Sequence, residues 1–343
     1  MNTLQSGLGV DLPVLAAPMA GGPSSPALVA AAARAGGLGF LAGGYKTAQA
    51  LAGQIHTTRL DGVASFGVNL FVPNPVPVSD EAYRRYAREV QAEADRYGLT
   101  LPEEPVEDDD HWTDKIDLLT SSPVPWVSFT FGIPGRVVVD ALRRAGSVVL
   151  QSVTSADEAR RAAESGVDAL IVQAQAAGGH SATLTPARPP APVPLPDLIA
   201  AVRHAVALPV IATGGITTPD GVAAALRAGA AAAMVGTVLL RTHESGASAP
   251  HKAALVDPAF AATVVTHAFT GRPARALRNH FTDRYDPVAP AGYPALHHLT
   301  GPLRKAATEA GDTRLIHLWA GTGHGEARVE CAADTFARLA SRL

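Results

Sequence analysis

The chain has 343 residues, of which 47% are hydrophobic, enough apolar material for one large core and a common length for an α/β barrel. Its 28 lysines and arginines nearly balance 31 aspartates and glutamates, and the net charge of -3, without any basic block, argues against nucleic acid or membrane partners. Cys331 is the only cysteine, so an intrachain disulfide is excluded and nothing indicates an oxidising compartment or a thiolate metal site. We expect Cys331 to be a small residue in the last helix.

The chain starts MNTLQSGLGVDLP, without the charged start and apolar run of a signal peptide. The later apolar stretches are interrupted by Gly, Pro or charged residues within the length of a strand. We therefore expect a cytoplasmic, soluble protein, and the sequence leaves its oligomeric state open.

Short β-rich runs alternate with Ala-rich helical stretches through most of the chain. Most of these runs are continuously apolar, which is typical of strands buried on both faces. Eight consecutive βα units favour a closed (β/α)8 TIM barrel, and a doubly wound open sheet is the main competing fold. The expected strands are VLAAPM (14–19), GLGFLAG (37–43), FGVNLF (66–71), WVSFTFG (126–132), VVLQSV (148–153), ALIVQA (169–174), PVIATGG (209–215) and AAMVGTVLL (232–240).

The helices between these strands carry recognisable start and stop signals. PALVAAAARAG has Ser24 and Ser25 as candidate caps and Pro26 in its first turn, and it ends at a glycine pair. SADEARRAAESG and TPDGVAAALRAG follow the same plan, each with Gly near the C-cap position.

Two segments depart from the βα repeat. Residues 73–123 form an insertion after strand three that is too long for an ordinary loop, so we expect helices above the barrel's C-terminal face, with the acidic run EEPVEDDD as solvated surface. Residues 256–343 are expected to cap the active-site mouth and to end in a helix from Glu326 onwards. We assign residues 1–255 to the barrel and treat the extension as part of the same domain, because no second independent core is evident.

Chemistry on a (β/α)8 barrel is carried by the loops that follow the strands. APMAGG (17–22) follows strand one, and its two glycines allow a flat ligand to approach the backbone closely, while Met19 offers a polarisable contact. The alternative is a Gly-rich turn before a helix.

Asn69 lies inside the apolar strand GVNLF (67–71). A buried carboxamide needs partners for both of its ends, and a cofactor heterocycle offers alternating donors and acceptors. The alternative is a core Asn bonded to a neighbouring strand.

The most informative loop is VQAQAAGGH (172–180). It follows strand six, which delivers Gln173 inward, turns on Gly178 and Gly179, and presents His180 at the mouth. Imidazole is a suitable base near neutral pH, and a Gly-Gly turn leaves it accessible, so we expect His180 to act in catalysis or substrate binding.

Two further glycine segments, TGGI (213–216) and MVGT (234–237), come with strands seven and eight. Barrels commonly hold a cofactor phosphate on backbone N–H groups at these two positions, and an amide nest needs no lysine. The histidines of the tail lack metal-binding spacing, and GxSxG and Walker motifs are absent, so metal sites, acyl transfer and nucleotide hydrolysis are not expected.

Taken together, these segments resemble the nitronate monooxygenases, formerly called 2-nitropropane dioxygenases, which are FMN enzymes on a (β/α)8 barrel. The matching text spans nearly the whole chain, including APMAGGPSSPALVAAAARAGGLGFLAGG, FGVNLFVP, VSFTFGIP, ATGGI, VGTVLLRTHESGA, FTGRPARALRN and LWAGTG. The resemblance implies FMN-dependent oxidation of alkyl nitronates, and of nitroalkanes after His180 removes the α-proton, by O2 to a carbonyl compound and nitrite. Together, the motifs and the resemblance assign flavin contacts to Met19, Ala20, Gly21, Gly22, Asn69, Gln173, Gly178, Gly179, Gly214, Gly215, Met234, Val235, Gly236 and Thr237.

The sequence departs from the family pattern at three positions. Ala174 and Gln175 replace Gly and Glu of the usual QGxEAGGH motif, and Met234 stands where Gln is common. The missing Glu removes a charge that could orient the loop or bind a cation.

Other functions remain open on the same fold. An NAD(P)H-dependent flavin reductase of a quinone or an enoyl thioester would use the same barrel and Gly-Gly-His loop. An isomerase of the inosine-5′-phosphate dehydrogenase type would need a nucleophilic Cys, and Cys331 lies far from any predicted strand end. A plain phosphate-binding barrel would hold no flavin.

Overall fold

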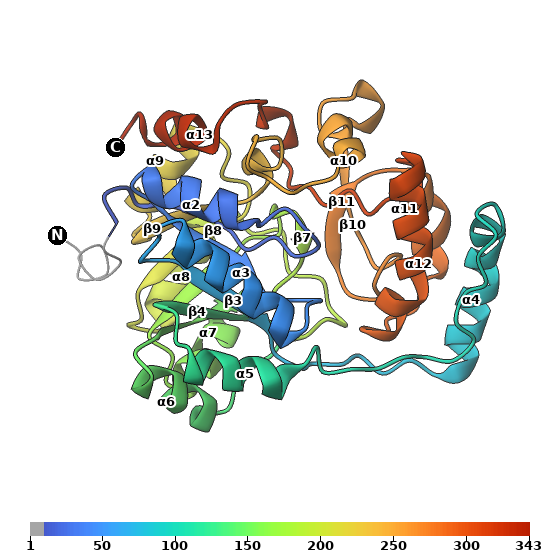
Figure 1. Ribbon diagram of the computed structural model, residues 1–343, viewed down its shortest axis with the longest axis horizontal. Helices are drawn as coiled ribbons and strands as arrows, with labels where there is room; N and C mark the ends of the chain where they lie inside the picture. Colours follow the sequence, from blue (N-terminus) through green and yellow to red (C-terminus); the bar gives the residue numbers. More distant parts are fainter. Residues whose placement is uncertain (1–9) are drawn as a thin grey trace.

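A computed structural model describes residues 10–343, and its core is a closed barrel of parallel strands (Figure 1). The barrel closes because β1 pairs with both β2 and β9. All eight predicted strands are present, so the TIM barrel is confirmed and the open sheet is not formed. The barrel strands are β1 (Val14–Ala16), β2 (Leu38–Ala42), β3 (Gly67–Phe71), β4 (Trp126–Thr130), β5 (Val148–Val153), β6 (Ala169–Gln173), β8 (Val210–Thr213) and β9 (Ala232–Val235).

The end of the last barrel strand differs from expectation. The run 232–240 is not one strand: β9 ends at Val235, and the 3-10 helix η1 (Thr237–Leu239) follows Gly236. The prediction about a signal peptide rests largely on residues 1–9, which lie outside the described residues.

Apolar residues fill both faces of the barrel strands. Phe40 and Leu41 are neighbours on β2 and are both buried, but Phe40 packs with Leu15, Trp126 and other residues that point into the barrel. Leu41 belongs to the larger cluster between the strands and the surrounding helices. This two-sided burial explains why the strands read as continuous apolar runs.

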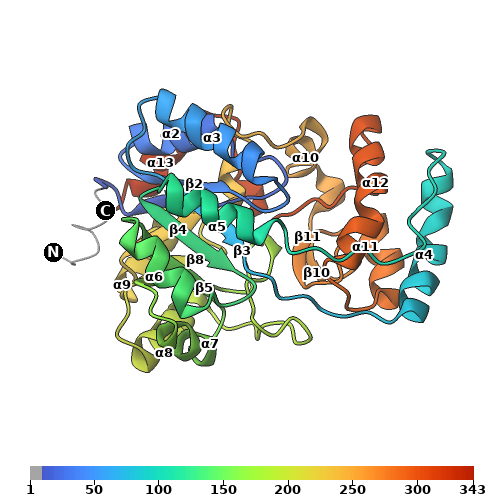
Figure 2. The ribbon, with the colours of Figure 1, turned by 60° about the horizontal axis from the view of Figure 1, so that its bottom comes forward.

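Helices surround the barrel on its outside (Figures 1 and 2). Ser25 caps the first of them through the Leu28 amide, with Pro26 at the start of the helix, as the sequence predicted. The surrounding helices are α2 (Pro26–Arg34), α3 (Ala48–Leu60), α5 (Trp112–Ser121), α6 (Arg136–Arg144), α7 (Ala156–Glu164), α8 (Leu195–Ala205), α9 (Pro219–Arg227) and α13 (Ala332–Ala340).

The last helix belongs to the barrel and not to the cap. α13 packs against α2, α9 and β1, so the end of the chain returns to complete the helical ring. It begins at Ala332, not at Glu326, which lies in the 3-10 helix η4 (His324–Glu326). Cys331 is the exposed N-cap residue of this helix, so the expected position inside the helix was wrong by one residue.

The insertion 73–123 divides between two places. α5 packs against α3, α6 and β3, which makes it the ordinary barrel helix between β3 and β4 and not a helix above the C-terminal face. α4 (Asp80–Asp95) instead lies beside α12 at the far side of the molecule from the barrel (Figures 1 and 2).

Part of the acidic run is also less exposed than expected. Asp110 forms a 2.8 Å ion pair with the buried ammonium of Lys115, and its other oxygen accepts from the Tyr45 amide at 2.9 Å. Burial raises the pKa of Asp110, although Lys115 works in the opposite direction.

A cap covers the carboxyl ends of the strands. It contains a small sheet in which β11 pairs with both β10 and β7, and β7 carries His180. The cap and α4 share a buried apolar cluster separate from those of the barrel, which composition had not revealed. Its elements are β7 (Gly179–His180), α10 (Ala249–Ala254), η2 (Pro258–Phe260), β10 (Thr263–Thr266), β11 (Ala274–Leu277), α11 (His280–Tyr285), η3 (Asp286–Val288) and α12 (Ala295–Ala310).

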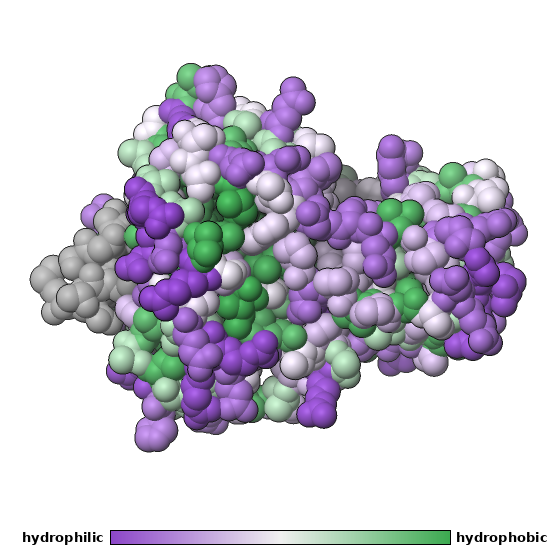
Figure 3. All heavy atoms as spheres, turned by 90° about the horizontal axis from the view of Figure 1, so that it is seen from below, coloured by the Kyte–Doolittle hydropathy of each residue, from purple (hydrophilic) through white to green (hydrophobic). Residues whose placement is uncertain are grey.

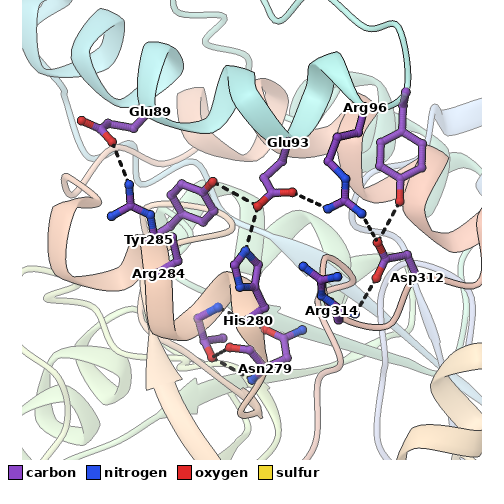
Figure 4. Close-up of polar contacts among 11 residues, drawn as sticks. Glu89, Glu93, Arg96, Asn279, His280, Arg284, Tyr285, Asp312 and Arg314 are labelled. Carbon is purple, nitrogen blue, oxygen red and sulfur yellow. Dashed lines mark hydrogen bonds and ion pairs between the residues drawn. The ribbon is translucent and has the colours of Figure 1, made fainter.

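A polar network joins α4 to the cap (Figure 4). Glu93 on α4 lies 2.7 Å from His280 Nε2 and accepts hydrogen bonds from Arg96 and Tyr285. Burial alone would raise the pKa of Glu93, but the bonds from Arg96 and His280 outweigh it and hold that pKa below its usual value. Asp312 accepts from Tyr97 at 3.0 Å at the end of the same network.

In Figure 3, hydrophilic residues dominate the visible face, with smaller apolar patches between them. None of the helices within residues 10–343 combines the length and the apolarity that crossing a membrane requires. The same residues contain no group of three or more His, Cys, Asp or Glu side chains arranged to hold a metal ion.

Candidate active site

A cavity of about 300 Å³ lies between the carboxyl ends of the barrel strands and the cap. It is lined by residues that follow most of the barrel strands and by cap residues such as His251, His317 and Trp319. Every predicted site residue except Gly22 contributes to its wall. These residues are Met19, Ala20, Gly21, Asn69, Gln173, Gly178, Gly179, His180, Gly214, Gly215, Met234, Val235, Gly236 and Thr237.

Gly22 is the exception because the turn after β1 directs it elsewhere. It is exposed, and a Cβ atom built on it would lie 3.1 Å from the carbonyl oxygen of Gly246. Gly22 therefore packs this turn against Gly246 and does not line the cavity.

Asn69 presents a free acceptor in the cavity wall. Its Nδ2 donates to Ser128 Oγ at 2.9 Å, to the Ser128 carbonyl at 3.2 Å and to Thr130 Oγ1 at 3.0 Å. Its Oδ1 has no hydrogen-bond partner among the described residues. The strand β4 thus fixes the carboxamide so that its oxygen is available to a ligand.

The loop after β8, the seventh barrel strand, forms a tight backbone cradle. Gly214 and Gly215 have φ of +106° and +78°, values that residues with a side chain rarely adopt. A Cβ atom on Gly215 would also lie 3.0 Å from that of Ala176. Thr218 then caps α9, whose N-terminus follows this loop.

Gly236 and Thr237, after the eighth barrel strand, line the same cavity. Among the described residues, no lysine or arginine lines the cavity. Backbone N–H groups and the α9 dipole would therefore provide the positive charge at an anion site here. This arrangement fits a phosphate group.

The His180 loop is held by Gln173. Gln173 Oε1 accepts from the Ala182 amide at 2.8 Å, and its Nε2 donates to the His180 carbonyl at 3.2 Å. Both ends of the carboxamide are therefore occupied by the loop, although the side chain also lines the cavity.

The glycine turn of this loop is needed for contact with the C-terminal part of the chain. A Cβ atom on Gly178 would lie 2.5 Å from the Gly321 amide nitrogen, which only a glycine avoids. Thr322 donates its amide to the Ala176 carbonyl at 3.1 Å, and Gly321 donates to Thr237 Oγ1 at 3.0 Å. The segment LWAGTG thus closes one side of the site.

The His180 imidazole is surrounded by aromatic rings. The centroids of Phe131, Tyr293 and Trp319 lie 5.6, 6.0 and 5.3 Å from its own. Burial, reinforced by the charges of Arg272 and Arg304, lowers the pKa of His180 to about 3. The ring is therefore a neutral imidazole at neutral pH, with a nitrogen free to accept a proton.

Sequence reasoning missed most of these neighbours. Thr130 and Ser152 line the cavity from the ends of β4 and β5, and their only signal is a polar residue at the end of an apolar strand. Tyr45 also lines the cavity and accepts from the Tyr293 hydroxyl at 3.4 Å, a contact that joins residues far apart in the chain.

The residues that differ from the family motif lie in two environments. Gln175 is not in the wall of the main cavity: its Nε2 donates to the Pro190 carbonyl at 2.7 Å, and its backbone carbonyl accepts from Arg275. Met234 lines the cavity from inside the barrel. Cys331 does not line it, which removes the residue that an isomerase with a cysteine nucleophile would need.

The closed barrel and the cavity at the carboxyl ends of its strands are those of an α/β-barrel enzyme. The chain belongs to the nitronate monooxygenase family, whose model matches residues 3–338. It is therefore an oxidoreductase of a flavin-dependent family, and a flavin cofactor is expected.

Individual relatives agree with this assignment. The chain is 33% identical over 324 residues to a probable nitronate monooxygenase of Staphylococcus aureus, covering 93% of this chain and 91% of that protein. It resembles the crystal structure of nitroalkane oxidase from Streptomyces ansochromogenes with 47% identity and a TM-score of 0.93, covering 100% of this chain and 98% of the other. FabK from Thermotoga maritima is also similar, with 25% identity, a TM-score of 0.77 and coverage of 100% and 96%.

Proposed function

We propose that this protein binds FMN non-covalently in the cavity and uses O2 to oxidise alkyl nitronates, and nitroalkanes after deprotonation, to carbonyl compounds and nitrite. The observation that carries the proposal is the position of His180, a neutral imidazole in the wall of the same cavity as the glycine cradle. The likeness to a nitroalkane oxidase supports the same substrate class.

The residues present fit FMN. Gly214, Gly215, Gly236 and Thr237 would hold its phosphate on backbone N–H groups. A Cβ atom on Gly214 or Gly215 would crowd Ala174 or Ala176, so this loop requires glycine. Asn69 Oδ1 would accept a hydrogen bond from the flavin ring. The bound flavin would supply the electron-accepting and oxygen-activating chemistry, and the protein would supply orientation and charge.

His180 would act on the neutral nitroalkane. The Cα–H bond breaks, the proton moves to the unprotonated imidazole nitrogen, and the electron pair spreads onto the nitro group to give the nitronate. A nitronate that is already ionised lacks this proton and needs no base.

The low pKa of His180 in the free protein is compatible with this role. Once the proton has moved, the imidazolium lies next to an anionic nitronate, and an opposite charge at close range raises the pKa of the protonated base. Arg272 and Arg304 favour the anion in turn, because both are buried cations close enough to influence His180.

The first test is the identity of the chromophore. We expect the purified protein to be yellow and the heat-released compound to run as FMN. Nitronate turnover should consume O2 and yield nitrite and the carbonyl compound. A colourless protein that does not take up added FMN would overturn the proposal.

The NAD(P)H-dependent reductase is the alternative, and the same preparation separates the two. Under anaerobic conditions a reductase should lose its flavin absorbance when NADH or NADPH is added, whereas the proposed oxidase should lose it with a nitronate. Bleaching by the pyridine nucleotide alone would favour the reductase.

A further inference from the structure

Thr270 lies in a rigid turn of the cap between β10 and β11. The turn is held by hydrogen bonds from the Thr270 and Gly271 amides to the His267 carbonyl, at 3.2 and 2.7 Å. Gly271 has φ of +73°, and a Cβ atom on it would lie 2.6 Å from the Gly292 nitrogen. The backbone of Thr270 is therefore held in place, and its side chain, 1% exposed, is enclosed by its neighbours.

The Thr270 hydroxyl contacts the His180 ring. Thr270 Oγ1 lies 2.9 Å from His180 Nε2, and the same hydroxyl donates to the Arg272 carbonyl at 3.4 Å. A hydroxyl has one proton to donate. When that proton points to the carbonyl, His180 Nε2 must carry hydrogen and donate to Thr270.

The other ring nitrogen then remains free. His180 Nδ1 has no hydrogen-bond partner among residues 10–343, and the side chain lines the cavity. The backbone cannot easily swing the ring away, because His180 pairs with Ala274 in the cap sheet and Ser181 donates to the Pro273 carbonyl at 2.8 Å.

We propose that Thr270 is a positioning residue for His180. The Thr270 hydroxyl accepts the Nε2–H of His180, and this leaves the unprotonated Nδ1 of His180 in the cavity as the basic nitrogen. This inference rests on the proposed role of His180 as the base. It adds which nitrogen takes the proton and which residue determines the choice.

The other groups around His180 cannot replace this contact. Phe131 has no polar atom, and the indole N–H of Trp319 can only donate, so neither ring can accept the Nε2–H. The nearby titratable groups are Arg272, Arg304, His297, His317 and Tyr293, and none of them makes a hydrogen bond to the His180 ring within the described residues. Without the hydroxyl, a buried Nε2–H would lose its partner, so the other tautomer or another ring orientation becomes competitive.

The first experiment compares Thr270→Val, which keeps the shape, with Thr270→Ser, which keeps the hydroxyl. At equal FMN occupancy, turnover of a neutral nitroalkane should fall about tenfold to a hundredfold in Thr270→Val, the range expected for one lost orienting hydrogen bond. Turnover of the nitronate should change little, and Thr270→Ser should recover most of the neutral activity.

The second experiment does not depend on activity. The ¹⁵N shifts of histidine-labelled, FMN-loaded protein report which ring nitrogen carries the proton, and His180→Asn identifies the signals of His180 among the twelve histidines. We expect protonated Nε2 and unprotonated Nδ1 in the wild type and in Thr270→Ser, and a mixture or the opposite tautomer in Thr270→Val.

The outcomes separate this inference from the proposed function. If Thr270→Val keeps both the wild-type tautomer and the wild-type ratio of the two activities, Thr270 does not position His180. If His180→Asn fails to lose neutral nitroalkane turnover selectively, the base role itself fails, and the inference falls with it. A protonated Nδ1 in the wild type would overturn the inference even if His180 is the base.

Discussion

The guanidinium of Arg272 lies over the face of Phe131, with its central carbon 4.0 Å from the ring centroid. Phe131 also makes an edge contact with His180, so the cation sits behind the wall of the active site. One Arg272 nitrogen donates to the Thr183 carbonyl, whereas Nε and Nη1 have no partner among the described residues. Burial lowers the pKa of Arg272 to about 10, which still leaves it charged at neutral pH.

Replacing Arg272 should therefore change the pH dependence of the reaction. Burial is the main cause of the low pKa of His180, and the charge of Arg272 lowers that pKa further. Arg272→Met should therefore raise the pKa of His180 from about 3 toward its ordinary value. Because the base must be unprotonated, the acid limb of kcat/KM for a neutral nitroalkane should move to higher pH. Arg272→Lys keeps the positive charge and should move the acid limb less. An acid limb at the same pH in the wild type and both variants would contradict the prediction.

The role of His180 is tested by His180→Asn. Turnover of a neutral nitroalkane should fall by roughly two to four orders of magnitude, the usual contribution of a positioned base, while that of the nitronate falls far less. FMN occupancy must be equal in both proteins, so that cofactor loss is not read as loss of the base. Equal losses on both substrates would assign His180 to binding or to tuning of the flavin.

The glycine cradle is tested by a matched pair of variants. Gly215 and Gly62 share φ of +78°, but only Gly215 has a neighbour within 4 Å of its Cβ position, and Gly62 lies outside the cavity. Gly215→Val should purify with less flavin, whereas Gly62→Val suffers the same backbone strain and should retain it. Equal flavin content in the two variants would argue against a phosphate at this loop.

Asn69→Ala should also weaken flavin retention, because it removes the free Oδ1 acceptor in the cavity wall. The measurement is the dissociation constant of FMN by fluorescence titration of the apoprotein. Asn69→Asp keeps an acceptor oxygen but loses the donor to Ser128 and Thr130, so it separates ligand binding from support of the strand. Wild-type affinity in Asn69→Ala would exclude a contact with the flavin.

The contacts between α4 and the cap should contribute to the stability of the fold. Glu93 is buried and bonded to His280, so Glu93→Gln should lower the free energy of unfolding by about 1–3 kcal/mol, as for a buried polar group that loses its partner. Glu89→Gln on the same helix is the control, because its 3.8 Å pair with Arg284 is exposed and should contribute little. Urea unfolding of both variants measures the difference, and similar midpoints would contradict it.

The sequence alone determined the barrel. Its strands are buried on both faces, so each is visible as a continuous apolar run in the sequence. The helix ends are visible because Ser at the start and Gly at the end act on the backbone of adjacent residues. The strand-end segments were found for the same reason, since parallel strands bring their carboxyl ends to one face. The roles assigned to these residues remain predictions.

Only the tertiary structure decided what surrounds His180. Thr270, Tyr293 and Trp319 contact it from the cap and from the segment after α12, and no local pattern encodes such distant contacts. The return of α13 to the barrel and the burial of Asp110 against Lys115 depend on the same long-range packing. Burial among these groups also sets the pKa of His180, because desolvation depends on the whole enclosure and not on the residues adjacent in sequence.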